Sequence, residues 1–287
     1  MYERNRMQND FSLIDANLSR AREGLRVLED SVRFVLHDPY LYETIKTLKR
    51  SLIEIEQLFG RARLLAARWG EDVWASRGMD LRPHTSLLDI IRANSNRVGE
   101  SLRVLEEFSR IYVPELVSRI QERRYQLYQI ERQIGEHLPQ YWLEKYFSEG
   151  IVYPIGRTAQ EIIWFIEHGA KIVQLRAKHS PRQEVYEEAK QICHFIFDWQ
   201  KENTSQKILC IVNDDVEVAA HLPVAGVHVG QEDGSLRLAR QRLGTEKIIG
   251  RSTHSVGQAR QAYQEGADYL SIGPMFSSAN KPQRSAI

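Results

Sequence analysis

The stretch VQLRAK, residues 173–178, alternates apolar residues with Gln174, Arg176 and Lys178. Successive side chains of a strand point to opposite faces, so these residues predict a strand with one apolar face and one face carrying two cations and an amide. A surface strand of a half-exposed sheet would fit this pattern. A strand whose polar face points into the mouth of a barrel would also fit, and there the two cations would form an anion site.

The sequence around this stretch alternates strand and helix from about residue 150 onward. We expect six strands, written IVYPIG, KIVQLRAK, KILCIVND, GVHVGQ, KIIGRSTH and DYLSIGPMF and beginning at residues 151, 171, 207, 226, 247 and 268. Strands separated by helices with short loops are typical of parallel βαβ units. Such units build either an open doubly wound sheet or a (β/α) barrel.

Polar residues follow the apolar run of several of these strands, and they favour the barrel. They are Asn213 and Asp214, then His228, Gln231 and Asp233, then Ser252 and His254, and finally Ser277, Ser278, Asn280 and Lys281. The C-terminal rim of a barrel collects side chains from successive strands, whereas an open sheet concentrates them at one switch point. The sequence also has no GxGxxG turn after the first strand. We therefore expect an α/β fold with an incomplete TIM-type barrel of about six strands at residues 148–287.

The residue types at this rim suit a diphosphate and its metal ion. Mg²⁺ prefers oxygen ligands, commonly one or two carboxylates with water and substrate phosphate, and Asp214 and Asp233 are the candidates. Arg176 and Lys178 would neutralise phosphate oxygens as charge builds on a leaving group. Asp214 could equally cap a helix that begins near Val216.

The motifs QLRAK, VND, GVHVGQED, GRSTH and GADYLSIGPMF, in this order, resemble those of the thiamine phosphate synthase family over roughly residues 150–282. The resemblance implies a (β/α)₈ barrel and a Mg²⁺-dependent transferase of thiamine biosynthesis. Such an enzyme joins a hydroxymethylpyrimidine diphosphate to a thiazole phosphate with loss of pyrophosphate. It passes through a dissociative transition state, which agrees with a site that lacks an obvious general-base nucleophile.

The resemblance also implies roles for particular residues. The substrate-binding residues would be Gln174, Leu175, Arg176, Ala177, Lys178, Asn213, Ser252, Ser278, Ala279, Asn280 and Lys281, of which Arg176, Lys178 and Lys281 would be catalytic. Asp214 and Asp233 would hold the Mg²⁺. His228 and His254 need no catalytic role, and we expect core or helix-capping histidines. The run from Ser278 to Lys281 replaces a T-x-T-K pattern of the family, which weakens phosphate binding there without abolishing it.

The sequence ends at Ile287, after six expected strands, where the family has two further strand–helix units. A barrel without a quarter of its wall would expose two unpaired edges. Three explanations are considered: a truncated or frameshifted reading frame, completion by another polypeptide, or a relic. The first is favoured, and it puts the activity of the chain in doubt.

The first half of the chain repeats itself. Residues 16–30 and 93–107 agree at nine of fifteen positions, and the similarity continues from Pro39 and Pro114. Each copy reads as two helices, with the proline near the start of the second. We therefore expect a pseudo-twofold four-helix bundle within residues 1–140.

The two copies share a polar pattern of Asn, Arg and Glu at positions i, i+3 and i+6, namely Asn17, Arg20 and Glu23 and then Asn94, Arg97 and Glu100. One interpretation is a solvated face with weak ion pairs, or a repeat kept for packing. The other is a symmetric polar pocket or partner surface. The sequence does not decide between them.

Composition limits the remaining functions. The formal net charge of +1 argues against nucleic-acid or membrane-surface binding driven by bulk charge, so we expect small-molecule substrates as partners and leave a homo-oligomer open. Two cysteines and no apolar run at the N-terminus suggest a cytoplasmic protein. Two alternatives remain. One is a thiazole tautomerase-like enzyme, and the other is a helical ligand- or partner-binding module with an inert barrel remnant.

Overall fold

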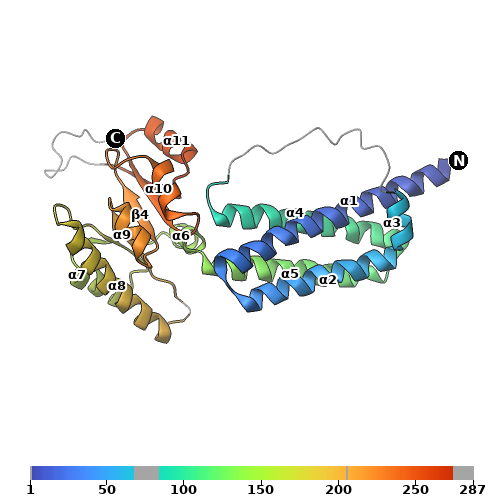
Figure 1. Cartoon of the computed structure of the whole chain (residues 1–287), viewed down its shortest axis with the longest axis horizontal. Coiled ribbons are helices and arrows are strands. Elements are labelled where there is room, and N and C mark those ends of the chain that lie inside the picture. The colour runs from blue at the N-terminus through green and yellow to red at the C-terminus, as the bar shows by residue number, and fades with distance from the viewer. Residues whose placement is uncertain (1, 68–83, 205, 274–287) are drawn as a thin grey trace. The chain divides into compact units, whose positions relative to one another are not determined.

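The computed structural model describes residues 2–67, 84–204 and 206–273, which fall into two compact units (Figure 1). The helical unit ends at His137, and the α/β unit begins at Leu138 and also includes residues 85–87. No helix in the described part of the chain is both long and apolar enough to cross a membrane.

The helical unit contains the helices α1 (Tyr2–Ser31), η1 (Val32–Leu36), α2 (Pro39–Phe59), α3 (Arg61–Ala67), α4 (Leu87–Tyr112) and α5 (Leu116–His137). Helix α2 begins at Pro39, and Asp38 before it accepts a hydrogen bond from the Leu41 N–H at 2.9 Å. Proline at the first helical position and aspartate before it are a favourable start, because the first N–H groups have no intrahelical acceptor. The sequence patterns did not indicate the short helix α3 or the π-helical turn η1.

Most of the apolar residues that the two sequence copies share lie in the core of this unit. The buried pairs are Leu25 and Leu102, Leu28 and Leu105, Leu41 and Leu116, Ile45 and Ile120, Leu52 and Leu127, and Ile55 and Ile130, none of which is more than 3% exposed. Helices α1 and α4 come close at Gly24, where a Cβ atom would lie 2.6 Å from a Val98 methyl group. Core packing therefore accounts for most of the sequence repetition.

The shared polar residues divide into buried and exposed positions. Asn17 and Asn94 are buried, and each side chain donates to the carbonyl four residues earlier in its own helix. The shared arginines and glutamates, Arg20, Glu23, Arg97 and Glu100, are exposed. This arrangement favours the solvated face over the symmetric pocket.

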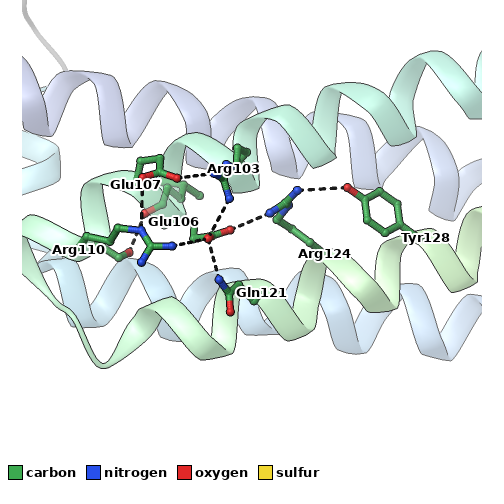
Figure 2. Close-up of polar contacts among 9 residues, drawn as sticks. Arg103, Glu106, Glu107, Arg110, Gln121, Arg124 and Tyr128 are labelled. Carbon is green, nitrogen blue, oxygen red and sulfur yellow. Dashed lines mark hydrogen bonds and ion pairs between the residues drawn. The ribbon is translucent and has the colours of Figure 1, made fainter.

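Figure 2 shows a cluster of polar contacts in the helical unit, around the fully buried carboxylate of Glu106 on α4. Arg124 of α5 donates to it at 2.8 Å and Gln121 at 2.9 Å, while Arg103 and Arg110 of α4 itself lie at 3.1 and 3.0 Å. These contacts tie the end of α4 to α5. They also meet the hydrogen-bonding needs of a charge that has lost its water.

The same contact recurs in the first copy of the repeat. Glu29 matches Glu106 in the sequence alignment, Lys49 matches Arg124, and Lys49 donates to Glu29 at 2.6 Å. The cross-helix ion pair between the two helices of each copy thus occupies equivalent positions.

The α/β unit begins with α6 (Pro139–Ser148) and continues with six strands: β1 (Ile155–Gly156), β2 (Ile172–Leu175), β3 (Leu209–Asn213), β4 (Gly226–Val229), β5 (Ile248–Thr253) and β6 (Tyr269–Ile272). The helices between them are α7 (Ala159–Glu167), α8 (Arg182–Glu202), α9 (Val216–His221), α10 (Leu236–Leu243) and α11 (Val256–Gln264). All neighbouring strands are parallel, in the order β1-β2-β3-β4-β5-β6. The expected six-stranded parallel half-barrel is confirmed, although β1 is much shorter than the stretch IVYPIG.

Alternate residues of the strands build two apolar layers. Val173, Leu175, Cys210 and Val212 point to the outer layer, where helices cover the sheet. Ile172, Leu209, Ile211 and Ile248 point inward and pack with Leu143 and Tyr146 of α6. The Tyr146 hydroxyl donates to the Lys207 carbonyl at 2.6 Å, just before β3, so α6 covers the inner face near the beginning of the strands. The opposite ends of the strands are left for the cavity.

Candidate functional site

The even residues of VQLRAK line a cavity of about 870 Å³ in the α/β unit. Gln174, Arg176 and Lys178 all contribute to its wall, whereas Val173 and Leu175 are buried against the outer helices. The alternation expected of a strand explains this division, because the side chains of one face share the interior. The cation-bearing face of the stretch therefore lies on the inside of the half-barrel.

Most of the predicted site residues in the described part of the chain meet at this cavity. The predicted residues in its wall are Gln174, Arg176, Lys178, Asn213, Asp214, Asp233 and Ser252. Leu175 and Ala177 point to the other face and pack in the outer apolar layer, so they could reach a ligand only through their backbone. Ser277, Ser278, Ala279, Asn280 and Lys281 lie outside the described residues.

Asp214 is directed to the cavity by an unusual backbone conformation. Its φ is +64°, in the left-handed region where aspartate is tolerated better than most residues, and its N–H donates to the His228 carbonyl at 2.8 Å. The cap of α9 is the next residue, Asp215, which accepts from the Val218 N–H at 3.0 Å and from Arg182 at 2.8 Å. The helix-capping alternative for Asp214 is therefore wrong, and its carboxylate remains available to the cavity.

Asp214 and Asp233 form a pair of facing carboxylates. Burial, a hydrogen bond shared with Asp233 and the negative charge of Asp233 raise the pKa of Asp214 to about 6, although Lys178 and Arg176 oppose the shift. Two carboxylates this close favour either a shared proton or a shared cation. Their neighbourhood thus has the electrostatic character of a cation site bordered by two basic residues.

Hydrogen bonds from Gly230 and Arg251 hold the loop that carries Asp233. The Gly230 N–H donates to the Asp233 carboxylate at 2.7 Å, and the buried Arg251 of β5 donates to the carbonyls of Gly234 at 3.0 Å and Gln231 at 3.3 Å. Arg251 bonds two carbonyls of one loop, so it restricts the position of the carboxylate.

A set of aromatic and polar side chains lies in the wall of the cavity beside these charges. Tyr153, His228 and Tyr269 are joined to Ser252 and Gln174 by hydrogen bonds inside the half-barrel. His228 is 6% exposed, as expected of a core histidine, but it also borders the cavity. His254 bonds the Gly273 carbonyl through its ring, and Ser255 caps α11 in its place.

The sequence patterns missed the two tyrosines. Tyr153, just before β1, and Tyr269 of β6 lie 116 positions apart in the sequence, and their hydroxyls lie 3.0 Å apart inside the half-barrel. The available signal was the placement of both residues in expected strands, IVYPIG and DYLSIGPMF.

The residues at the rim fit a magnesium ion. Within residues 2–67, 84–204 and 206–273, no group of three or more His, Cys, Asp or Glu side chains could hold a metal by itself. Two carboxylates are nevertheless the donor set that Mg²⁺ uses when water and substrate phosphate supply its other ligands. The raised pKa of Asp214 agrees, because a carboxylate pair of this kind is stabilised by a bound cation.

Comparisons with known proteins show which family the chain is similar to. Residues 155–287 match the family model described as thiamine monophosphate synthase, and residues 12–133 match the ThiD2 family. The chain is 35% identical to the thiamine-phosphate synthase of Synechococcus sp. WH7803 over 95% of its own length and 77% of that protein. It is 34% identical to the thiamine-phosphate synthase of Gloeobacter violaceus over 96% of its length and 78% of that protein. A solved thiamine phosphate pyrophosphorylase from Pyrococcus furiosus shares 31% identity with a TM-score of 0.38, over 43% of this chain and 60% of that one.

Parallel strands that bring basic and acidic side chains together at their C-terminal ends are typical of α/β enzymes of the barrel class. The similarity to full-length relatives narrows this class. The chain belongs to the thiamine-phosphate synthase family, the transferases of thiamine biosynthesis.

Proposed function

We propose that the cavity of the half-barrel binds 4-amino-2-methyl-5-hydroxymethylpyrimidine diphosphate and condenses it with 4-methyl-5-(2-phosphooxyethyl)thiazole. The products are thiamine phosphate and pyrophosphate. The observation that carries the proposal is the convergence of Arg176 and Lys178 with Asp214 and Asp233 on one cavity. The family membership supports the same reaction.

In the proposed reaction the bond between the pyrimidine methylene carbon and the pyrophosphate oxygen breaks, and the electron pair leaves with the pyrophosphate. The thiazole nitrogen then donates its lone pair to the methylene carbon. Arg176 and Lys178 stabilise the negative charge that develops on the leaving group. Gln174, Asn213 and Ser252 hold the pyrimidine ring by hydrogen bonds.

Asp214 and Asp233 would hold Mg²⁺ in this proposal. When bound, the ion supplies positive charge to the diphosphate. The proposed catalytic role of Lys281 and the proposed phosphate contacts of Ser278, Ala279 and Asn280 concern residues outside those that the structure describes.

The thiazole tautomerase-like alternative shares the barrel but transfers no diphosphate. The carboxylate pair opposite two cations favours diphosphate chemistry, since tautomerisation needs no cation site of this kind. Pyrophosphate release from the two substrates separates the alternatives. Aromatisation of a thiazole precursor without pyrophosphate release would support the tautomerase.

The test of the proposal is pyrophosphate release by the full chain with and without Mg²⁺. Chelation should abolish release and added Mg²⁺ should restore it. Asp214→Asn should lower kcat/KM by about a hundredfold or more, because it removes one charge of the cation site. Asp198→Asn is the matched control, since Asp198 is exposed on α8 and paired with Lys201. Release that is unaffected by both chelation and Asp214→Asn would contradict the proposal.

We also infer that the helical region, residues 1–140, is a pseudo-twofold four-helix bundle and a separate domain from residues 148–287. The buried repeat positions and the equivalent ion pairs Glu29–Lys49 and Glu106–Arg124 support this. The alternative of an independent ligand- or partner-binding module rests on the same repeat. A fragment of residues 1–140 that is unfolded, or that binds nothing in titrations, would count against that alternative.

A further inference from the structure

Five side chains form a continuous hydrogen-bonded network inside the half-barrel. Gln174 of β2 donates to the Tyr153 hydroxyl at 3.0 Å, and the Tyr153 and Tyr269 hydroxyls lie 3.0 Å apart. The Tyr269 hydroxyl is 2.9 Å from Nδ1 of His228, and Nε2 of His228 is 2.8 Å from Oγ of Ser252. The network thus runs from Gln174 to Ser252, and Ser252 borders the cavity.

The members of this network are held in place by packing. Gln174, His228 and Tyr269 are between 3% and 8% exposed. The Tyr269 ring lies against Gly250 so closely that a Cβ atom there would be 2.1 Å from Cζ of the ring. The rings of Tyr153 and His228 contact the Tyr269 ring at centroid distances of 6.1 and 5.4 Å. These contacts leave the side chains little freedom to exchange partners.

Each member of the network keeps the hydrogen that it needs to donate. The His228 ring has the Tyr269 hydroxyl at Nδ1 and the Ser252 hydroxyl at Nε2, so one ring nitrogen can accept while the other donates. Burial raises the pKa of Tyr153 and of Tyr269, so both phenols stay protonated. Only the direction of the hydrogen bonds is then left to determine.

The Gln174 amide sets that direction. Its nitrogen donates to Tyr153 and is also within hydrogen-bonding reach of Tyr269. If Tyr153 donates to Tyr269, Tyr269 donates to His228 and every hydrogen has an acceptor. In the opposite direction Tyr153 would accept from both Gln174 and Tyr269. These two are its hydroxyl partners in residues 2–67, 84–204 and 206–273, so its own hydrogen would point to the cavity with no acceptor on the protein, and one hydrogen bond of the network would be lost.

We propose that this network fixes the His228 proton on Nε2, so that Ser252 accepts from His228 and turns its own hydroxyl hydrogen toward the cavity. His228, Tyr269 and Tyr153 are then positioning residues that act through Ser252. The ligand must offer Ser252 an acceptor, such as an unprotonated nitrogen of a heteroaromatic ring. This last point rests on the proposed function, whereas the position of the proton does not.

The proton can be located in the full chain without any substrate. Long-range ¹H–¹⁵N spectra of ¹⁵N-histidine-labelled protein distinguish a protonated from an unprotonated ring nitrogen, and His228→Gln identifies which of the nine histidines is His228. We expect Nε2 protonated and Nδ1 bare at neutral pH. A proton on Nδ1, or on both nitrogens, would overturn the proposal.

Two variants test the direction of the network. Ser252→Ala should leave the proton on Nε2, because the donors that determine it lie on the Nδ1 side. Tyr269→Phe should abolish the preference for Nε2, whereas Tyr263→Phe, at an exposed position of α11, should not. A shift of the proton to Nδ1 in Ser252→Ala, or an unchanged spectrum in Tyr269→Phe, would contradict the proposed direction of the network. The wild-type and Ser252→Ala spectra decide the direction even when Tyr269→Phe does not fold.

Steady-state kinetics add a readout that structural damage would not give. His228→Phe keeps an aromatic ring but offers Ser252 no donor, so it should raise KM for the pyrimidine diphosphate about tenfold, with a smaller change in kcat and none in KM for the thiazole phosphate. His228→Gln offers an amide N–H and should recover part of the loss. If His228→Phe and His228→Gln raise KM equally, and for both substrates alike, His228 has a purely structural role. If the wild type releases no pyrophosphate, the proposed function fails, but the proton position is still measured.

Discussion

Gly250 has no side chain, which leaves room for the ring of Tyr269 in the wall of the cavity. It lies on β5, and the Tyr269 ring of β6 occupies the space that a Cβ atom would take. Tyr269 cannot move away without breaking its hydrogen bonds to Tyr153 and His228. Even a methyl group at position 250 would therefore disturb both the packing of the core and the wall of the cavity.

Gly250→Ala should lower the free energy of unfolding by about 1–3 kcal/mol, because overpacking forces the Tyr269 ring out of place. Urea denaturation measures the loss. The matched control is Gly257→Ala on α11, where the nearest atom to the new Cβ is the Ser255 hydroxyl at 3.8 Å. There the helical preference of alanine should leave stability unchanged or raise it by up to about 1 kcal/mol. Equal stability of the two variants would contradict the packing argument.

Single residues of the site were predictable from sequence where strand alternation decides their direction. Gln174, Arg176 and Lys178 follow this rule, and so do the opposite directions of Leu175 and Ala177. The roles of Asp214 and Asp215 were not separable, because either neighbour could cap α9 and only the positive φ of Asp214 decides between them. The Tyr153–Tyr269 contact depends on the curvature of the sheet, which no local pattern encodes.

Strand β5 and its Arg251 connect two elements of the rim. The Arg251 guanidinium holds the Gln231 and Gly234 carbonyls on either side of Asp233. A leucine would fill much of the same volume but leave both carbonyls without this donor. The loop after β4 would then be more mobile. Asp233, which this loop carries, would be held less firmly at the cation site.

Arg251→Leu should therefore raise the Mg²⁺ concentration needed for half-maximal pyrophosphate release by about tenfold, which corresponds to the loss of a charge-assisted hydrogen bond. A Mg²⁺ titration of the activity measures the change. Arg260→Leu, at an exposed position of α11, serves as the control. An unchanged Mg²⁺ requirement in Arg251→Leu would show that the loop holds Asp233 without it.

The contact between helices α4 and α5 depends on the buried carboxylate of Glu106, just as the loop after β4 depends on Arg251 (Figure 2). Burial alone would raise its pKa, but hydrogen bonds from Gln121 and Arg124 and the charge of Arg103 hold the pKa below its usual value of 4.5. A carboxylate with a lowered pKa contributes stability above the pKa of the unfolded chain. That contribution is lost as the pH falls below about 4.5 toward the folded pKa.

Glu106→Gln should lower the free energy of unfolding by about 1–3 kcal/mol at neutral pH, since the part-buried Arg124 and the half-exposed Arg103 and Arg110 lose the counter-charge to which they donate. The difference between variant and wild type should shrink as the pH falls below about 4.5, because the wild-type carboxylate becomes protonated there. Glu29→Gln is the matched variant at the equivalent position of the repeat. Lys49 is more exposed than Arg124, so Glu29→Gln should lower the free energy of unfolding by about 1 kcal/mol or less. A pH-independent difference for Glu106→Gln would exclude this explanation.

The whole molecule consists of two units with cores of their own. The helical core is built from the repeated leucines and isoleucines, and the α/β core from the two layers of the half-barrel. The repeat and the change from helical to alternating patterns near residue 150 made this division predictable. The sequence did not indicate α6, because a ten-residue helix with an irregular apolar pattern gives little signal.

Thermal unfolding followed by circular dichroism should therefore show two transitions, one for each core. Glu106→Gln should lower the midpoint of one transition and Gly250→Ala that of the other. The double variant should show both shifts unchanged, because substitutions in separate cores with no common partner are expected to be additive. A single transition that both substitutions shift would show that the two cores unfold together.

The strand order of the half-barrel has a consequence for synthesis of the chain on the ribosome. Each strand pairs with the strand that precedes it, so every new βα unit finds its docking edge already translated. Assembly can proceed in one direction with short loop closures, which cost little entropy. The nascent chain would acquire Arg176 first, then the two aspartates, and last Tyr269. The network that orients Ser252 would thus be completed only when the sixth strand leaves the exit tunnel.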